Sequence, residues 1–242
     1  MKLKGNTYTF IFAFIVCVIC SFSLAAISQG LKAKQELNIA LDIKKNILKA
    51  VDLRHPLAKD ASPQDVLSVY DEKIEEVVVD EEGNIVEGKT PEDLSGEETA
   101  DQNLYPLYIY KEGGEVVAYC FPIEGKGLWS TLYGYLALEP DAITVRGITF
   151  YKHGETPGLG AEIEQDWFQN NFKGKKIWSE EENKLTPPEV VKGHVEGMIA
   201  EDEQFHYVDG ISGATMTSKG VTALLDKWIR TYNPFFKKIR KT

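Results

Sequence analysis

Cysteine and histidine are scarce in this chain, which has three cysteines and four histidines among its 242 residues. Cys17 and Cys20 lie in an apolar run, where free cysteine is a common small hydrophobic residue, and we interpret both as structural. Cys120 lies in a strand-like run without a partner in the sequence, so no disulfide framework is predicted. The histidines show no metal-ligand spacing, and the sequence therefore predicts no metal site.

Basic clusters and nucleotide-binding motifs are also missing. The formal net charge is −10, and no group of Lys and Arg is mixed with aromatic residues, which argues against a nucleic-acid-binding protein. No G-x-G-x-x-G sequence opens a βαβ pattern, so we expect no NADH site of the Rossmann type. The chain lacks a catalytic triad and a paired-carboxylate motif, and we assign no catalytic residue.

An uncharged apolar run is the first feature that the chain does have. Residues Tyr8–Ile27 are about as many as a helix needs to cross the hydrocarbon core of a membrane. Lys2 and Lys4 precede the run, which favours an N-terminus in the cytoplasm. A cleaved signal peptide is the main alternative, because Leu24–Ala26 contains small residues near a potential cleavage site. We favour an uncleaved anchor, since the run is longer than a usual signal core.

The segment that follows the anchor has weaker patterns. Residues 32–52 place leucines near one face and predict a helix that continues from the apolar run. A second helix is predicted to begin near Asp65, and residues 77–79 (VVV) predict a short strand. Residues 87–103 are acidic and poor in large apolar residues, which indicates an exposed loop.

The remaining chain alternates strand-like and helix-like segments. Leu104–Tyr110 and Glu115–Phe121 flank two glycines and predict a β-hairpin. The other predicted elements are strands at 142–151, 189–191 and 205–208 and helices at 167–172 and 218–232. Runs of strands with helices at the ends favour an α+β fold with a mostly antiparallel sheet. We predict three regions: an N-terminal tip and anchor over 1–30, a connecting region over 31–103 and a folded domain over 104–242.

The most informative motif is the turn Asp209–Thr215 (DGISGAT), which leads into the last helix. Backbone N–H groups at a helix N-terminus bind phosphate well, and glycine lets the main chain come close to an anion. A threonine hydroxyl at this place can donate to a phosphate or become esterified to one. The alternative is an ordinary turn in which Thr217 or Ser218 caps the helix.

A second unusual segment is Gly127–Gly134 (GLWSTLYG), which matches neither a clean helix nor a clean strand. The indole of Trp129 and the phenol of Tyr133 lie beside flexible backbone, where they can border a flat aromatic ring system. The alternative is that both side chains fill the core.

A third segment, His153–Ala161 (HGETPGLGA), contains three glycines and a proline directly after a predicted strand. Such a composition requires a fixed, turning backbone. A rigid loop with exposed N–H groups and one apolar side chain, Leu159, is suited to hold the edge of a flat ring. We expect His153 to be a hydrogen-bonded loop histidine.

The three motifs, in this order behind one membrane helix, closely resemble those of the C subunit of the sodium-translocating NADH:quinone oxidoreductase. The resemblance covers nearly the whole chain, although the stretch from Gly193 to Gln204 is longer than expected. It implies a flavin-binding domain on the periplasmic side of the bacterial inner membrane, behind a single-pass anchor. It also implies one FMN, bound covalently by a phosphoester to Thr215.

The same resemblance implies the other residues that contact the flavin. They are Asp209, Ser212, Gly213, Ala214, Thr217, Trp129, Ser130, Glu155, Thr156, Leu159 and Gly160.

The resemblance further implies partners. A separate FMN transferase, using FAD and Mg²⁺, would install the flavin, because threonine is a poor nucleophile unaided. Electrons derived from NADH would arrive from an iron–sulfur centre in a partner protein of the complex. They would leave for a flavin in another membrane subunit, and eventually for ubiquinone.

Three other functions stay open at this point. The first is the homologous flavinylated subunit of an ion-translocating ferredoxin:NAD⁺ oxidoreductase. The second is a free-standing exported flavoprotein that feeds another acceptor. The third is an anchored binding or assembly module without a cofactor.

Overall fold

The computed structural model describes residues 5–52, 62–94, 103–179 and 183–240, and the chain divides into two compact units, Met1–Ile43 and Lys44–Thr242. In its described part the first unit is helical and belongs to α1 (Gly5–Ala50), whose last turns are part of the second unit. Every side chain of the uncharged run from Tyr8 to Ile27 is exposed. With 46 residues, α1 is longer than a membrane crossing requires, and its N-terminal part is apolar enough to make one. The helix predicted beyond the anchor is confirmed as its continuation.

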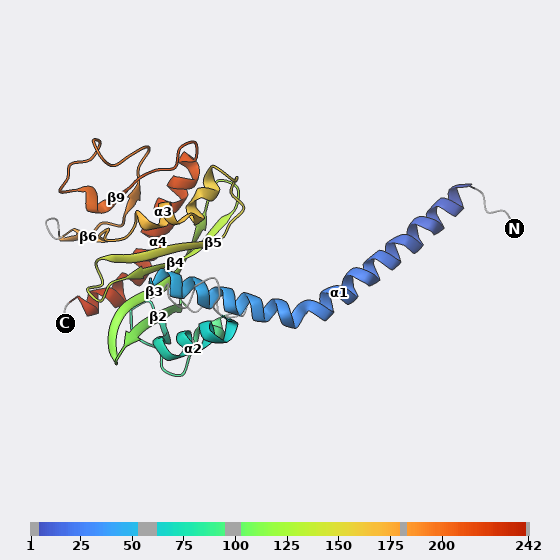
Figure 1. Cartoon of the computed structure of the whole chain (residues 1–242), viewed down its shortest axis with the longest axis horizontal. Coiled ribbons are helices and arrows are strands. Elements are labelled where there is room, and N and C mark those ends of the chain that lie inside the picture. Colours follow the sequence, from blue (N-terminus) through green and yellow to red (C-terminus); the bar gives the residue numbers. More distant parts are fainter. Residues whose placement is uncertain (1–4, 53–61, 95–102, 180–182, 241–242) are drawn as a thin grey trace. The chain divides into compact units, whose positions relative to one another are not determined.

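The second unit is built on one antiparallel sheet in which the strands follow chain order (Figure 1). Its strands are β1 (Ile74–Val79), β2 (Tyr105–Glu112), β3 (Glu115–Lys126), β4 (Thr131–Leu138) and β5 (Val145–Lys152). β2 and β3 are joined by Gly113 and Gly114, which both have positive φ, as a tight two-residue hairpin requires. The α+β class and the predicted hairpin are confirmed.

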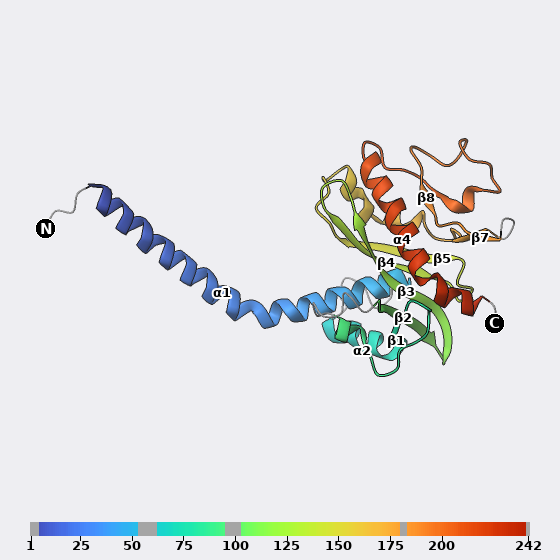
Figure 2. The same cartoon turned by 180° about the vertical axis from the view of Figure 1, so that it is seen from behind.

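Helices cover both faces of the sheet (Figures 1 and 2). Side chains alternate along a strand, so Leu107 and Phe121 face α4 (Thr215–Ile239), while Tyr108 and Cys120 face the opposite side. That opposite side is covered by the last turns of α1 and by α2 (Pro63–Lys73), which begins at a capping box of Ser62 and Asp65. The helix start predicted near Asp65 is therefore confirmed.

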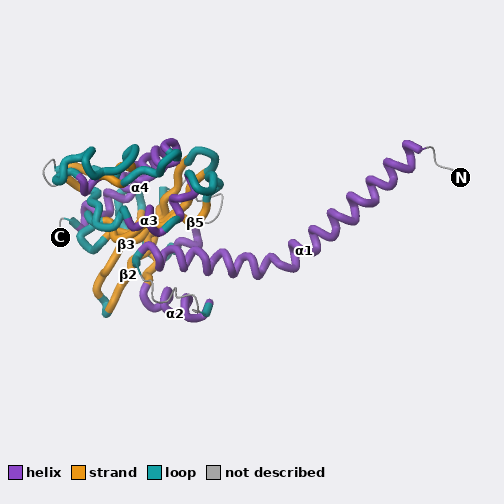
Figure 3. The backbone as a smooth tube through the Cα atoms, turned by 45° about the horizontal axis from the view of Figure 1, so that its top comes forward, coloured by secondary structure: helices purple, strands orange, loops and turns teal. Residues whose placement is uncertain are grey.

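The remaining elements are short and border the loops that precede α4. They are α3 (Asp166–Asn170), the 3₁₀ helices η2 (Pro91–Leu94), η4 (Gly160–Glu164) and η5 (Gln204–His206), the pair β6 (Trp178–Ser179) and β7 (Lys184–Leu185), and the parallel pair β8 (Glu189–Val190) and β9 (Tyr207–Val208). Figure 3 shows loops gathered at the end of the domain that is remote from α2.

Two sequence predictions are wrong in detail. The sequence pattern does not predict β4, because Gly134 interrupts its apolar run, and the pairing with β5 shifts register there. The last helix is predicted over 218–232 but extends from Thr215 to Ile239, through Pro234. Of the predicted acidic loop, residues 87–94 contain no buried side chain, and residues 95–102 lie outside the described part.

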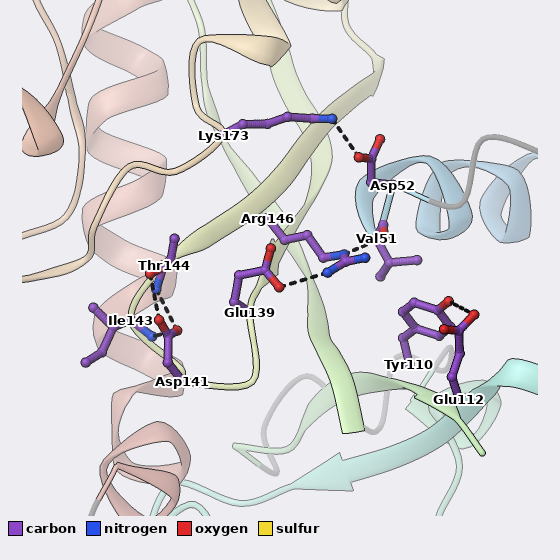
Figure 4. Close-up of polar contacts among 10 residues, drawn as sticks. All are labelled: Val51, Asp52, Tyr110, Glu112, Glu139, Asp141, Ile143, Thr144, Arg146 and Lys173. Carbon is purple, nitrogen blue, oxygen red and sulfur yellow. Dashed lines mark hydrogen bonds and ion pairs between the residues drawn. The ribbon is translucent and has the colours of Figure 1, made fainter. Parts of the chain in front are cut away.

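The end of α1 is fixed to the sheet by polar contacts (Figure 4). The guanidinium of Arg146 on β5 donates from Nε to the carbonyl oxygen of Val51 at 2.7 Å and from an η nitrogen to Glu139 at 2.8 Å. Asp52 leaves the helix with a positive φ of 62° and pairs with Lys173 at 2.8 Å. A basic side chain that binds the last carbonyls is a favourable helix end.

Close backbone contact in the same region predicts the effect of Gly147→Ala. A Cβ at Gly147 would lie 2.4 Å from the carbonyl oxygen of Ala50. We expect the substitution to lower the free energy of unfolding of the second unit by about 1–3 kcal/mol, because backbone must move to admit the methyl group. Thermal or urea unfolding measures the loss. Gly30→Ala, which meets nothing within 4 Å, is the control, and equal unfolding curves for both variants would contradict the prediction.

Candidate functional site

The turn before α4 presents an exposed threonine at a helix N-terminus. Gly213 has a positive φ of 76°, which favours glycine, and Thr215 is the first residue of the helix and is exposed. Ala214 is the N-cap residue and makes no side-chain cap bond. The alternative in which Thr217 or Ser218 caps the helix is therefore wrong. The first N–H groups of a helix have no acceptor within it, so this turn can bind an anion.

The carboxylate of Glu155 joins the three motifs. It is 5 % exposed, and its Oε1 accepts from the backbone N–H groups of Trp129 at 2.9 Å and Ser130 at 3.2 Å. Its Oε2 accepts from the backbone N–H of Leu128 at 3.2 Å and from the hydroxyl of Thr217 at 2.6 Å. Glu155 thus links its own loop to the β3–β4 turn and to the first turn of α4.

Two glycines leave room for this carboxylate. A Cβ at Gly127 would lie 2.7 Å from Oε1 of Glu155, and a Cβ at Gly160 would lie 2.5 Å from the hydroxyl oxygen of Thr217. Burial opposes ionisation of Glu155, but the hydrogen bonds from Thr217 and from three backbone N–H groups outweigh it and lower the pKa of the carboxyl below its usual value. The group is therefore a buried anion with all its donors in place.

The loop after β5 is held by local hydrogen bonds. The backbone N–H of Glu155 donates to Nδ1 of His153 at 3.2 Å, and Nε2 of His153 lies 3.2 Å from a carboxylate oxygen of Glu164. The expectation of a hydrogen-bonded loop histidine is confirmed. Leu159 is 41 % exposed, and its Cδ2 lies 2.8 Å from the position of a Cβ at Gly213. The loop therefore contacts the turn before α4.

The β3–β4 turn presents its tryptophan to solvent. The N–H of Gly127 donates to the carbonyl of Ser130 at 2.8 Å, and the hydroxyl of Ser130 accepts from the N–H of Gly154 at 2.5 Å. The side chain of Trp129 is 72 % exposed on this ordered turn. The alternative in which Trp129 fills the core is wrong. Tyr133 is half-buried, with the amine of Lys152 5.1 Å above its ring.

Asp209 ties the turn before α4 to the preceding loop. Its carboxylate accepts from the N–H of Val195 at 2.8 Å and lies 3.0 Å from Nδ1 of His194. Burial opposes ionisation of Asp209, but the bonds from His194 and Val195 outweigh it and lower its pKa. A second tie is the N–H of Gly210, which donates to the carbonyl of Gly193 at 2.8 Å.

Two grooves meet at Thr215. One has a volume of about 830 Å³ and is bordered by Gly158, Trp167, the 209–213 turn and Thr215. The other has a volume of about 510 Å³ and lies along the first turns of α4. Lys192 borders both grooves. Sequence reasoning missed it, because an isolated lysine before a loop carries no signal that the fold will bring it to Thr215.

The predicted site residues fall into two groups. Those that a ligand can reach, exposed or half-exposed, are Thr215, Ser212, Gly213, Trp129, Ser130, Thr156, Leu159 and Asp209. Those that are buried beneath them are Glu155, Gly160, Ala214 and Thr217. Contacts connect the two groups, so the fold brings together the three motifs that lie far apart in the sequence.

Comparison with known proteins places this arrangement. The sequence pattern of the FMN-binding domain matches residues 127–230, which include all three motifs. The C subunit of the Na(+)-translocating NADH-quinone reductase of Vibrio alginolyticus is 34% identical over 245 residues, covering 92% of this chain and 91% of that protein. The chain belongs to this family of C subunits. The family member from Yersinia pestis is 34% identical over 96% of this chain and 92% of its own length.

Solved structures of the same family agree with the fold. The structure from Parabacteroides distasonis has a TM-score of 0.70 and 33% identity, and the match covers 85% of this chain and 96% of that chain. The NqrC structure from Shewanella oneidensis has a TM-score of 0.67 at 23% identity and covers 83% of this chain and 97% of that chain, which shows the shared fold. The family, the fold class and the FMN-binding domain predicted from the motifs are therefore confirmed. The chain is a subunit of an oxidoreductase complex that pumps sodium.

The lowered pKa of Asp209 predicts how a variant responds to pH. The carboxylate stabilises the fold above its unfolded pKa, and this contribution disappears as the pH falls through the folded pKa. We expect Asp209→Asn to be less stable than the wild type by about 1–2 kcal/mol near pH 6, with the difference shrinking below about pH 4. Denaturant unfolding at several pH values measures it. A difference that stays constant from about pH 6 to about pH 3 would contradict the assignment.

Proposed function

We propose that Thr215 carries FMN through a phosphoester and that this domain relays single electrons within the reductase complex. The observation that carries the proposal is the exposed hydroxyl of Thr215 at the first turn of α4, where two grooves meet. The turn fits a phosphate, because Gly213 has no side chain and the helix N-terminus supplies N–H donors. FMN supplies reversible one-electron chemistry when it is bound.

Attachment requires a second enzyme. The side-chain oxygen of Thr215 forms a bond to the flavin phosphorus of FAD, the pyrophosphate bond breaks, and AMP leaves. The hydroxyl proton passes to a base of the transferase, because the described residues around Thr215 include no activating base like that of a triad. Mg²⁺ held by the transferase offsets the phosphate charge.

Covalent attachment suits a domain outside the cytoplasm. Lys2 and Lys4 precede the apolar part of α1, which favours a cytoplasmic N-terminus and a periplasmic domain. Free FMN is scarce there, and a covalent link makes binding intramolecular, so that occupancy no longer depends on affinity. The chain then consists of an anchor over 1–30, a connecting region over 31–103 and the flavin-binding domain over 104–242. The connecting region also supplies α2 and β1 to the sheet domain.

The exposed residues around Thr215 hold the ring. Trp129 and Leu159 provide apolar surfaces on either side of the turn, and Ser212 and Thr156 provide hydroxyls. Packing and hydrogen bonding of this kind fix a flavin and tune its potential. The domain accepts electrons from an iron–sulfur centre of a partner protein and passes them to a flavin in another membrane subunit, on the way to ubiquinone.

Thr215→Ala tests the attachment. We expect the variant, expressed with an FMN transferase, to lose all covalent flavin, because alanine has no oxygen to esterify. Denaturing gels scanned for flavin fluorescence and intact mass spectrometry measure the loss. Thr231→Ala, which removes a hydroxyl from a half-buried threonine farther along the same helix, should keep the flavin. Fluorescent flavin that still migrates with denatured Thr215→Ala would refute the proposal.

Trp129→Phe tests the position of the ring. Excited tryptophan transfers energy to a nearby flavin, and we expect loss of Trp129 to remove more of the transferred flavin emission than loss of any distant tryptophan. Trp178→Phe is the control, because Trp178 lies under Arg240 at the other end of α4. Excitation spectra of the flavin emission compare the two variants, and an equal decrease in both would place the ring elsewhere.

A further inference from the structure

The buried carboxylate of Glu155 has no capacity left for a ligand. Each of its oxygens accepts two hydrogen bonds, at distances between 2.6 and 3.2 Å. The side chain is buried, and the positions of Cβ atoms at Gly127 and Gly160 lie within 3 Å of its oxygens. A water molecule or a flavin N–H group therefore finds neither space nor a free lone pair at this carboxylate.

We infer that Glu155 is a positioning residue for the flavin, rather than a flavin ligand. Its charge holds the β3–β4 turn, the loop after β5 and the first turn of α4 in one arrangement. This inference rests on the proposed function, because it concerns the site in which Thr215 carries FMN. The geometry behind it is independent of the cofactor and is present in the folded chain.

The donors require a carboxylate. Three consecutive backbone N–H groups, those of Leu128, Trp129 and Ser130, point toward one anionic group, in the manner of a backbone nest. Glutamine at this position offers one oxygen, and its amide NH₂ faces N–H donors that then lose their acceptor. Unsatisfied buried donors are costly, so the turn that carries Trp129 would leave its position.

The hydroxyl of Thr217 transmits this arrangement to the attachment point. It donates to Glu155 at 2.6 Å, and the side chain of Thr217 is 1 % exposed. Thr217 lies two residues after Thr215 in the same helical turn. One carboxylate thus fixes the place of the esterified hydroxyl relative to Trp129 on one wall and Leu159 on the other.

The experiment uses the full chain, purified in detergent after co-expression with an FMN transferase. We expect Glu155→Gln to carry about tenfold less covalent flavin at a fixed expression time, the change that corresponds to one charge-assisted hydrogen bond. The flavin that is attached should fluoresce more like free FMN. Its midpoint potential should move in the positive direction, because a nearby negative charge opposes reduction. Intact mass, fluorescence and redox titration give the three readouts.

The pair Thr217→Val and Thr217→Ser removes and restores the hydroxyl without touching Glu155. Thr217→Val should shift flavin fluorescence in the same direction as Glu155→Gln, and Thr217→Ser should behave as the wild type. Glu139→Gln is the stability control, because it breaks a half-buried ion pair with Arg146 remote from the motifs. It should lower stability and leave the flavin readouts unchanged.

The outcomes separate the two proposals. A wild-type chain without covalent flavin would refute the proposed function. A wild-type chain with flavin, together with a folded Glu155→Gln that matches it in yield, fluorescence and potential, would overturn the positioning role. Equal behaviour of Thr217→Val and Thr217→Ser would also overturn it, as would flavin changes in Glu139→Gln as large as those in Glu155→Gln.

Discussion

Four hydrogen bonds converge on the buried carboxylate of Glu155, and the geometry of the whole site depends on them. A buried charge is tolerated only where its donors are complete, because the loss of solvation is otherwise uncompensated. The carboxylate and its donors come from three segments that lie far apart in the chain. Satisfying the charge therefore requires the β3–β4 turn, the loop after β5 and α4 to be assembled at once. The cost of an incomplete arrangement selects one structure for the site.

On this base the outer layer can be polar and open. Ser212, Gly213 and Thr215 are exposed, and their backbone is fixed by the N-terminus of a helix that packs along the sheet. An open site binds a free cofactor weakly, because little surface is buried. A covalent bond removes that limitation and leaves the ring near the surface, which suits electron transfer between subunits. Openness and covalent attachment are therefore consistent with one another.

Much of this could be read from the sequence, for physical reasons. The uncharged run, the hairpin around Gly113 and the amphipathic last helix each have a local pattern, and all three are present in the structure. The motif segments stand out because clustered glycines, hydroxyls and aromatics are unusual together.

The rest depends on contacts between distant segments, which no local pattern encodes. Glu155 is one acidic residue among many in the sequence, and only the fold shows that it points inward. The sequence predicts that Thr217 contacts the ligand or caps the helix, whereas its hydroxyl is buried against Glu155. β4 escapes prediction because Gly134 breaks the apolar alternation, although the neighbouring strand supplies the backbone partners.

The buried thiol on the sheet has a practical consequence. Cys120 is the one cysteine of residues 44–242 and is 0% exposed. Burial raises the pKa of this thiol, so it stays protonated and unreactive at neutral pH. A single cysteine introduced on the surface of this unit is therefore the only position there that a maleimide or a spin label reaches. Distances from the flavin to a partner can be measured in this way without first replacing the native cysteine of the sheet.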